Sequence, residues 1–585
     1  MKVSDFIIDL LARKNIRAIF GYPGGSVLHI LNSIRTNGRI KYIQLYHEQS
    51  AAFAADAYAR VAQTAGAALA TSGPGATNLL TGVANAYFDS VPTIFITGQV
   101  SQRSMKQQQP VRQRGFQEID IAAMASPVTK YAKTFASTEE IFEELPQAIL
   151  CAESGRPGPV LLDLPHNLQA ADIPDRQIDT FYSSACLPAI TPAPSADNIA
   201  ENDLDMVCAW LSRARRPLVL AGGGVAARKS RPVLTEFVDF FDLPVVASLM
   251  GLAAIDNDHP LYSGFIGSYG QRAANFCLAN TDLLIVLGSR LDERQVGNVP
   301  EQFAPDARIV HVDIDPGELN HRVRADLGFG CEATVFMKKI LADFDGPMLK
   351  HDAWKQQIKA WKSKYPPSEI RREFGLSPNQ VLAGIDGMIA PDAIVCLDVG
   401  QNQMWAAQSI SFSGTRQLVS SSGHGAMGYA LPASIGASYA AVGRQVICVA
   451  GDGGFQMNLQ ELQTLVRDAL PIKIFLLNNN SLGMIREFQE RLFDGNCIGS
   501  VDGYSTPNFE KIAEAYGIPY TRIASLSDIE CIKNNLDNPL PHIFEVCIPT
   551  NAPLEPYPRP YRPVEDQLPE LTAEELDEMY AVRKL

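Results

Sequence analysis

The sequence predicts an α/β protein built from three doubly wound parallel-sheet domains, and three observations support this prediction. Its 585 residues are too many for one hydrophobic core and indicate several domains. Short apolar runs alternate with helix-like stretches, which is the pattern of parallel sheets covered by helices. Hydrophobic residues make up 46% of the chain and charged residues 19%, as expected when sheets are buried on both faces.

The first domain is expected over residues 1–170. The chain starts with apolar residues at helical spacing and a charge among them, which indicates an amphipathic helix and not a signal sequence. Strands are expected at 18–20, at the starts of 42–60 and 67–78, and over 92–99 and 158–165.

A proline-rich linker is predicted next, because Pro174, Pro188, Pro192 and Pro194 stand in a stretch without periodicity. The second domain is expected over 195–348, with strands at 217–225, 243–249, 282–288 and 308–315.

A polar connector with Pro366 and Pro367 leads to the third domain, expected over 368–548. Its predicted strands lie at 393–400, up to Ala450, at 472–477 and at 542–548. The tail, 549–585, is rich in proline and acidic residues, and we expect it to lie over the surface before a short helix at 573–581.

Charge and cysteine usage limit the function classes. The net charge of −14 argues against nucleic acid and anionic membranes as partners. No run reaches transmembrane length. The ten cysteines are scattered without a CxxC pair, and several stand inside apolar runs, so they are expected to be reduced core residues of a cytoplasmic protein.

One stretch carries the chemistry. The predicted strand that ends at Ala450 runs directly into Gly451, Asp452, Gly453 and Gly454. Asn479 follows the next strand, 27 positions after Asp452, so strand, helix and strand can return both side chains to one sheet edge. A carboxylate and an amide oxygen, with phosphate oxygens, suit Mg²⁺, and the glycines allow a diphosphate to approach the backbone. The alternative is an ordinary glycine-rich loop between buried strands.

Further words in the sequence resemble a known family. They are FGYPGG (20–25), TSGPGATN (71–78), GFQEIDI (115–121), RPGPVLLDLP (156–165), SLMGL (248–252), DVGQNQMWAAQ (398–408), GAMGYALPASIGA (425–437) and NNNSLGMI (478–485). With Glu48 and the Asp452–Asn479 pair, they are similar to thiamine diphosphate carboligases and decarboxylases. Within that superfamily the chain most resembles the large catalytic subunit of acetolactate synthase (acetohydroxyacid synthase) over nearly its whole length.

The resemblance implies a thiamine diphosphate-dependent transferase of branched-chain amino acid biosynthesis. It would decarboxylate pyruvate and transfer the two-carbon unit to a second carbonyl compound. Thiamine diphosphate, Mg²⁺ and a structural FAD are the implied cofactors. A keto acid would be the substrate. The active unit would be a homodimer or homotetramer with active sites shared between subunits, and a small regulatory subunit is a possible partner.

The resemblance also implies roles for residues at the thiamine diphosphate site. Glu48 would activate the pyrimidine, Met427 would support the bent cofactor, and Gly425 would bond the pyrimidine amine. Asp452, Asn479 and the backbone oxygen of Ser481 would ligate Mg²⁺. The remaining residues implied for this cofactor are Pro23, Gly24, Gly25, Asn78, Gln401, Gly451, Gly453 and Gly454.

For substrate, Phe116 and Gln117 would line the reaction site, and Arg294 would hold the acceptor carboxylate as a bidentate fork. Met484 and Phe488 would stand on the acceptor side. The residues implied for FAD are Arg156, Gly222, Gly223, Met250, Gly267, Gly270, Arg290, Asp292 and Asp313.

Each role has a plainer alternative. Glu48 could be a solvated carboxylate at a helix start, Met427 a core methionine, and Arg294 a surface arginine paired with Asp292 or Glu293. The middle domain could be empty or could bind a nucleoside diphosphate.

The sequence departs from the family pattern at Phe488, where many members have Trp, at Leu291 and Glu293, at His166, and in GSYG (267–270). These departures concern residues expected near the acceptor substrate more than those expected to act on the donor, pyruvate. A bulkier ketone such as a deoxy-keto-sugar nucleotide is therefore one alternative acceptor, and a pyruvate oxidase-like flavoenzyme is another alternative function. An inactive homologue acting in assembly or regulation would be expected to lack Glu48, Asp452 or Asn479, and all three are present.

Overall fold

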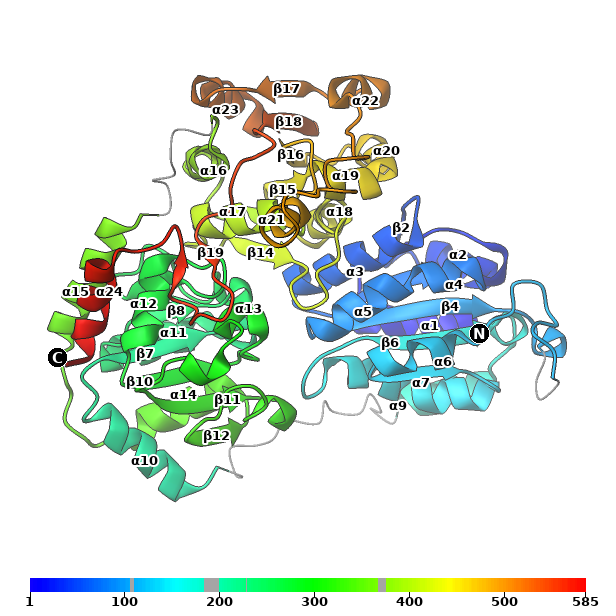
Figure 1. The fold of residues 1–585 in the computed structure, drawn as a ribbon. Helices are drawn as coiled ribbons and strands as arrows, with labels where there is room; N and C mark the ends of the chain where they lie inside the picture. Colours follow the sequence, from blue (N-terminus) through cyan, green and yellow to red (C-terminus); the bar gives the residue numbers. More distant parts are fainter. Residues whose placement is uncertain (106–109, 184–198, 228, 367–374, 585) are drawn as a thin grey trace.

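The computed structural model describes residues 1–105, 110–183, 199–227, 229–366 and 375–584, which form three α/β units in chain order (Figure 1). Each unit is built on a six-stranded parallel sheet with helices packed against it. The predicted fold class is confirmed. The linker residues Pro188, Pro192 and Pro194, the connector residue Pro367, and the predicted domain starts at 195 and 368 lie outside the described residues.

The first sheet has the strand order β2-β1-β3-β4-β6-β5. Its strands are β1 (Ala18–Gly21), β2 (Lys41–Gln44), β3 (Gly66–Ala70), β4 (Thr93–Gln99), β5 (Tyr131–Thr134) and β6 (Val160–Pro165). The main helices are α1 (Val3–Arg13), α2 (Leu28–Asn37), α3 (Glu48–Ala62), α4 (Pro74–Asn78), α5 (Leu80–Phe88) and α7 (Thr138–Glu153). The order reverses between β1 and β3, and ligands of such sheets bind beyond the strand ends at this switch point.

The third sheet repeats this topology with the order β14-β13-β15-β16-β18-β17, although the sequence shows no residue-level repeat. Its strands are β13 (Ile394–Leu397), β14 (Gln417–Ser420), β15 (Val446–Gly451), β16 (Lys473–Asn478), β17 (Tyr520–Ile523) and β18 (His542–Cys547). Its helices include α16 (Pro378–Asp386), α17 (Gln401–Ser409), α18 (Ala430–Ala440), α19 (Asp452–Met457), α20 (Leu462–Arg467), α21 (Gly483–Leu492), α22 (Phe509–Tyr516) and α23 (Glu530–Leu536). The switch point therefore lies between β13 and β15.

The middle sheet has a different order, β12-β11-β10-β7-β8-β9. Its strands are β7 (Pro217–Ala221), β8 (Val245–Ala247), β9 (Tyr262–Phe265), β10 (Leu283–Leu287), β11 (Arg308–Asp313) and β12 (Leu327–Gly330), and its main helices are α10 (Glu201–Leu211), α11 (Arg231–Phe241), α12 (Arg272–Asn280), α14 (Ala333–Asp343) and α15 (Asp352–Lys364). Counted along the chain, this is the 3-2-1-4-5-6 order of dinucleotide-binding folds, with the switch point between β7 and β10.

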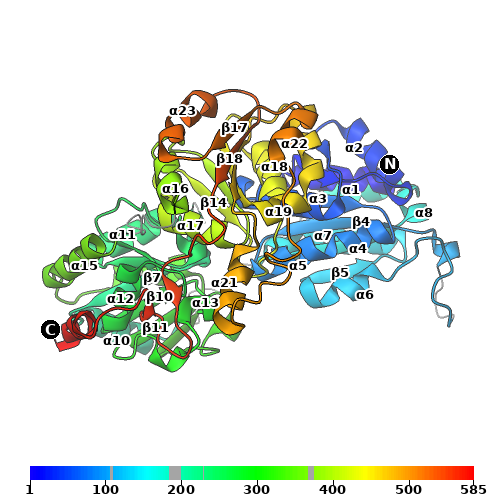
Figure 2. The same ribbon diagram turned by 45° about the horizontal axis from the view of Figure 1, so that its top comes forward.

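The first and third units share one hydrophobic core, centred on α3 and α18 (Figure 2). Small residues let these helices touch: a Cβ on Gly436 of α18 would overlap the carbonyl of Ala54 in α3. Phe53 and Tyr429 pack edge to face across the same contact, with ring centroids 5.2 Å apart. The switch-point edges of the two sheets are thus held in a fixed relation.

The tail is more deeply embedded than the sequence predicted. Leu554 and Gln567 are fully buried, and a short antiparallel pair, β19 (Tyr557–Pro558) with β20 (Gln567–Leu568), lies against the middle unit (Figure 1). The predicted last helix is confirmed as α24 (Ala573–Ala581), which begins with a capping box of Thr572 and Glu575. No helix among the described residues combines the length and the apolar character that a membrane crossing requires.

Candidate cofactor-binding and active site

Asp452 stands at the switch point of the third sheet, where β15 passes through Gly451 into α19. Its carboxylate is buried, and one oxygen, Oδ1, accepts from the Gly453 N–H at 2.8 Å. Among the described residues its other oxygen, Oδ2, is buried without a hydrogen bond of ordinary length, although the Tyr504 hydroxyl interacts with this carboxylate. Burial raises the pKa of Asp452 to about 7. A buried carboxylate oxygen without a partner is costly, and a bound cation would satisfy it.

Asn479 and Ser481 come from the end of β16 and lie against the same turn. The Asn479 amide nitrogen donates to Gln401 Oε1 at 3.2 Å, and Asn479 Oδ1 accepts from the Ser481 N–H at 3.2 Å. Ser481 is buried, and its hydroxyl has no hydrogen-bond partner in the described ranges. A Cβ on Gly453 would lie 2.5 Å from Leu482 Cδ2, so the two strand ends are in contact. The spacing between Asp452 and Asn479 in the sequence thus places oxygen atoms suited to Mg²⁺ at one sheet edge.

Met427 faces this site from the loop that precedes α18. Its Cε would lie 3.4 Å from a Cβ on Gly453. Gly425 and Gly428 flank it, and both adopt left-handed φ values of 68° and 80°, which favour glycine. Met427 therefore borders the glycine turn that carries Asp452.

Asp398, at the end of β13, is a site residue that the sequence reasoning missed. It is buried and accepts N–H bonds from Val399, Gly428 and Ala430 at 2.8–3.0 Å. A Cβ on Gly454 would collide with its carboxylate, so the turn after β15 packs directly on it. Burial raises its pKa to about 6. Its position at the start of the word DVGQNQ was the available signal.

Glu48 opens α3 at the equivalent edge of the first sheet. It is 8% exposed, so it is not the solvated carboxylate of the plainer alternative. Its Oε2 accepts from the Asn78 amide at 2.9 Å, and its Oε1 would lie 3.1 Å from a Cβ on Gly75. The buried carboxylate is therefore held by the turn that follows β3.

Two other predicted residues of the first unit, Gly24 and Gln117, pack against the turn that follows β3. At the end of β1, Gly24 packs on Thr71, and a Cβ there would collide with the threonine side chain; Pro23 and Gly25 are its neighbours. Gln117, with a left-handed φ of 64°, packs on Gly73, whose Cβ would lie 2.8 Å from that of Gln117. Phe116 is 84% exposed.

The sequence reasoning missed two further residues. They hydrogen-bond the segment around Glu48 to the third unit. Glu461 Oε1 accepts from the Tyr46 N–H at 3.0 Å. Asn458 Oδ1 accepts from the Ser50 hydroxyl at 3.0 Å, while the Asn458 amide donates to the Gly428 carbonyl at 2.6 Å. These residues follow the GDGG turn in MNLQE, so no motif position marked them.

The predicted acceptor-side residues Met484 and Phe488 lie on α21. Phe488 is 42% exposed, and its ring centroid is 6.2 Å from that of Tyr557 in the tail. The Arg491 guanidinium stands 3.9 Å from the Tyr557 centroid. Tyr557 and Arg491 were not predicted, because only the tertiary structure places the tail beside α21.

Arg294 lies in the short helix α13 (Glu293–Val296). Asp292 caps this helix and accepts from the Arg294 N–H at 2.9 Å. Among the described residues, no carboxylate forms an ion pair with the Arg294 guanidinium; Glu293 instead pairs with Arg322 at 3.6 Å. Arg294 faces the cavity of the middle unit.

That cavity measures about 1520 Å³ and lies at the switch point between β7 and β10, where all three units meet. Of the residues predicted for FAD, its wall contains Arg156, Gly223, Met250, Arg290, Asp292 and Asp313. The other three make backbone contacts: Gly222 with Gly288, Gly267 with Arg294, and Gly270 with Ile266. Arg156 also pairs with Asp315 and Glu318, at 2.7 and 2.8 Å.

Comparison with known proteins agrees with this architecture. Residues 1–124 match the N-terminal TPP binding domain of thiamine pyrophosphate enzymes, residues 204–340 their central domain, and residues 398–546 their C-terminal TPP binding domain. The fold and the site thus define a thiamine pyrophosphate enzyme, with thiamine diphosphate as its cofactor.

Full-length relatives define the family more closely. The chain is 36% identical to the acetolactate synthase large subunit of Cyanidium caldarium over 93% of both chains. It is 34% identical to the acetolactate synthase isozyme 2 large subunit of Escherichia coli (strain K12), over 94% of this chain and 96% of that one. It is 35% identical to the large subunit of Lactococcus lactis subsp. lactis (strain IL1403), over 89% and 88%. The chain belongs to the acetolactate synthase large-subunit family and is an acetolactate synthase-like enzyme.

Proposed function

We propose that this enzyme decarboxylates pyruvate and transfers the two-carbon unit to a second keto acid, using Mg²⁺ to hold the cofactor diphosphate. The observation that carries the proposal is the buried Oδ2 of Asp452, which has no hydrogen-bond partner among the described residues and lies in the turn that contacts Leu482, next to Ser481. When bound, thiamine diphosphate supplies the nucleophilic carbon and the electron sink that decarboxylation requires. The chain's own residues orient it and control protons.

Asp452, Asn479 and the backbone oxygen of Ser481 would hold Mg²⁺, leaving the remaining positions to diphosphate oxygens. Glu48 would hold a proton against the pyrimidine ring nitrogen. Asn78 donates to one Glu48 oxygen at 2.9 Å, which leaves the other oxygen for that ring. Because Glu48 is buried, its hydrogen bond to the ring would face little competition from water.

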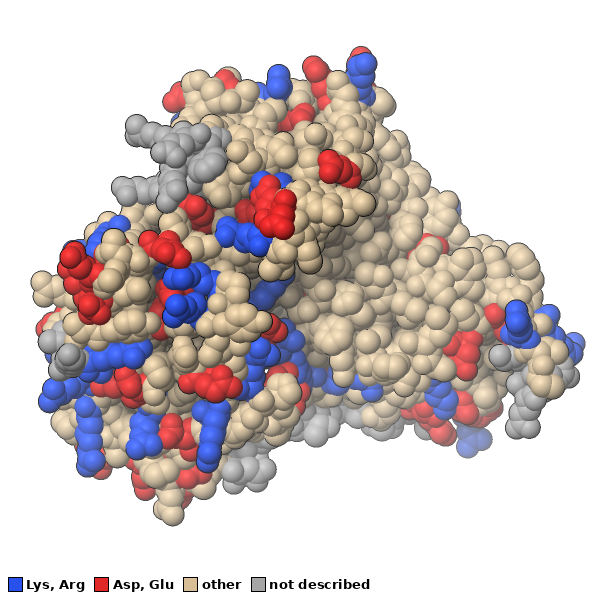
Figure 3. Space-filling view, in the orientation of Figure 1, with Lys and Arg blue, Asp and Glu red and all other residues tan. Residues whose placement is uncertain are grey.

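Glu48 and Asp452 would serve one cofactor across a subunit boundary, with the active unit a homodimer or homotetramer. The highly exposed Phe116, predicted to line the reaction site, supports this because a lining residue would need cover from another copy. Charged side chains gather over the middle unit and are sparse on the face of the first unit beside it (Figure 3). The small regulatory subunit and the cytoplasmic location stay predictions.

FAD is the proposed occupant of the cavity in the middle unit. The dinucleotide-type strand order and the position at the switch point support this assignment. The cavity exceeds the ~300–1,000 Å³ usual for small-molecule sites, as a dinucleotide requires. Asp313, at the end of β11, would bind the ribose, and Arg290 and the Gly223 backbone would face the pyrophosphate. Gly222, Gly267 and Gly270 would shape the wall through packing.

We propose that four residues contact the acceptor substrate: Phe488, Met484, Gln117 and Arg294. Arg294 would bind the carboxylate of the acceptor. We also propose the domain bounds 1–170, 195–348 and 368–548, followed by the tail 549–585.

The test is incubation of the purified protein with labelled pyruvate, Mg²⁺, thiamine diphosphate and a panel of keto acids and keto-sugar nucleotides, followed by mass spectrometry of the products. Labelled acetolactate from wild type, and its loss by about 100-fold or more in Glu48→Gln, is expected. Unchanged pyruvate consumption by Glu48→Gln would remove Glu48 from the mechanism. Peroxide release from pyruvate alone would select the oxidase alternative, and a flavin spectrum tests the FAD assignment.

A further inference from the structure

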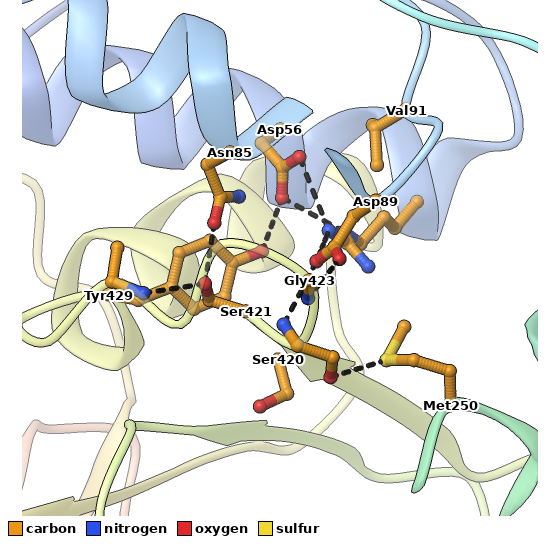
Figure 4. A network of polar contacts seen from close by, with 12 residues as sticks. Asp56, Asn85, Asp89, Val91, Met250, Ser420, Ser421, Gly423 and Tyr429 are labelled. Atoms are coloured by element: carbon orange, nitrogen blue, oxygen red, sulfur yellow. Dashed lines mark hydrogen bonds and ion pairs between the residues drawn. The ribbon is translucent and has the colours of Figure 1, made fainter. Parts of the chain in front are cut away.

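The loop that carries Gly425 and Met427 is held by the first unit, although it belongs to the third. The Asp89 carboxylate accepts from the Gly423 N–H at 2.6 Å and from the Ser422 N–H at 3.1 Å. Figure 4 shows Asp89 reaching the loop next to Gly423. Asp89 is the C-cap residue of α5, and its side chain is 3% exposed. A buried carboxylate of the first unit therefore supplies the acceptors for two loop amides.

The far end of the same segment is tied to Asp89 through two further side chains. Arg60 donates to Asp89 at 2.8 Å and to Asp56 at 2.9 Å. Asp56 in turn accepts a short hydrogen bond from the Tyr429 hydroxyl. Met427 thus lies between two anchors, the amides of Ser422 and Gly423 on one side and Tyr429 on the other. The carboxylates of the two anchors, Asp89 and Asp56, both accept from the buried guanidinium of Arg60.

Neighbouring contacts leave the loop little freedom. The Ser421 hydroxyl accepts from the Ala426 N–H at 2.9 Å and donates to Asn85 at 2.5 Å. The His424 ring stacks on Phe88, with centroids 5.6 Å apart. Asn85 and Phe88 belong to α5 and Asp89 is its C-cap, so the C-terminal end of α5 contacts this turn through three residues.

The loop is also wedged against the middle unit. A Cβ on Gly423 would lie 2.9 Å from Asp89 Oδ1 and 3.1 Å from Arg290 Nη2. The Ser422 hydroxyl lies 2.8 Å from Met250 Sδ. Only glycine fits at 423 without displacing a charged side chain.

We propose that Asp89 is a positioning residue for the thiamine diphosphate site. Methionine side chains are flexible, so the place of Met427 depends on its backbone. That backbone runs through two glycines with left-handed φ, which do not fix a loop by themselves. Asp89 supplies the fixed point by binding the amides of Ser422 and Gly423. This inference rests on the proposed function and on the role that the resemblance implies for Met427, support of the bent cofactor.

The test compares Asp89→Asn and Gly423→Ala with wild type. Asp89→Asn weakens both amide bonds and the ion pair with Arg60, while Gly423→Ala crowds the side chains of Asp89 and Arg290 and displaces the loop without removing a charge. Both are expected to raise the dissociation constant for thiamine diphosphate with Mg²⁺ about tenfold, and to lower kcat about 10- to 100-fold. The KM for pyruvate is expected to stay within about threefold, because neither residue binds substrate. Amide hydrogen exchange at 421–426 should accelerate in the cofactor-free protein.

The matched control is Asp242→Asn, which breaks the 2.7 Å pair with Lys355 in the middle unit and touches no loop residue. It is expected to change stability alone. If the Asp89 and Gly423 variants show faster exchange at 421–426 but wild-type cofactor affinity and kcat, Asp89 is merely structural and the inference is overturned. In the double variant, effects that simply multiply would also contradict a shared route. A wild type that neither binds thiamine diphosphate nor consumes pyruvate would instead overturn the proposed function. Should Asp89→Asn fail to fold, Gly423→Ala and Ser421→Ala carry the same comparison.

Discussion

Asp452 and Asp163 show how two buried aspartates of one chain differ. Asp163, on β6, accepts from Thr97, Gln99 and Thr134 at 2.7–2.9 Å. Asp452, equally buried, leaves Oδ2 without a hydrogen-bond partner within the described part of the chain. A residue that serves only the fold would gain nothing from this arrangement, whereas a cation ligand needs a free oxygen.

Asp452→Asn is therefore expected to stabilise the metal-free protein, by roughly 1–3 kcal/mol, because it removes a buried charge that has an unpaired oxygen. The same change should abolish the Mg²⁺-dependent binding of thiamine diphosphate. Thermal unfolding with a chelator, and calorimetric titration with Mg²⁺, measure the two effects. Asp163→Asn is the control and should destabilise, since its carboxylate is fully hydrogen-bonded. Equal destabilisation by both changes would contradict the role given to Asp452.

Glu461 gives a pH prediction at the same scale. Burial raises its pKa to about 7 from an ordinary 4.5, although bonds from Tyr46 and Thr464 oppose the rise. The protonated form thus favours the folded state, so the stability that it contributes is lost as pH rises from about 4.5 to above 7. Glu461→Gln removes this loss. The difference in Tm between the variant and wild type is expected to be small at pH 5 and to grow in favour of the variant toward pH 8. A difference independent of pH would contradict the burial effect.

At the scale of secondary-structure elements, hydrogen bonds to the tail fix the position of α21. Glu487 of α21 is buried and accepts from the Leu554 N–H at 2.7 Å and from the Gln401 amide at 2.8 Å. Arg486, also buried, donates to the Ala552 carbonyl at 3.2 Å. The helix that exposes Phe488 is thus fixed between Gln401, which was predicted to bind the cofactor, and the tail.

Glu487→Ala is expected to release the tail from α21, because it leaves the Leu554 N–H and the Gln401 amide without their acceptor. The loss should be about 3 kcal/mol, as for a buried charged group with a removed partner. Limited proteolysis should then cleave within 549–568 faster than in wild type. Glu490→Ala removes an exposed partner of Arg486 and should leave the cleavage rate nearly unchanged. Unaltered protection of the tail in Glu487→Ala would argue against this anchoring.

Whether the sequence predicted a strand depended on the position of that strand in its sheet. The sequence predicted the central strands of each sheet, and the edge strand β2. It missed β5, β9, β12, β14 and β17, which are all edge strands. Four of these are only partly buried, so their apolar patterns are broken. An apolar run signals a strand covered on both faces, and edge strands give a weaker signal.

At the scale of the whole molecule, Glu48 and Asp452 lie on separate sheets that share a core through α3 and α18. If each active site combines the first unit of one chain with the third unit of another, two inactive variants should complement each other. In a refolded mixture of Glu48→Gln and Asp452→Ala chains, half the dimers would be mixed, and each would hold one intact site. About a quarter of wild-type activity is expected for such a C2 dimer. Each variant alone should remain inactive, and a mixture that stays inactive would place both residues in one chain's site.

The sequence by itself determined the fold class, the central strands and the placement of Asp452 and Asn479 at one sheet edge. These features depend on burial patterns and on spacings within one strand–helix–strand unit, which short-range geometry fixes. Only the tertiary structure showed the cavity where the three units meet and the position of the tail beside α21. It also showed that Asp89 accepts hydrogen bonds from the loop that carries Met427. Asp89 and Gly423 are 334 positions apart, and no local pattern encodes contacts between residues so distant. They arise only when separately folded sheets pack together and each buried polar group must find its partner.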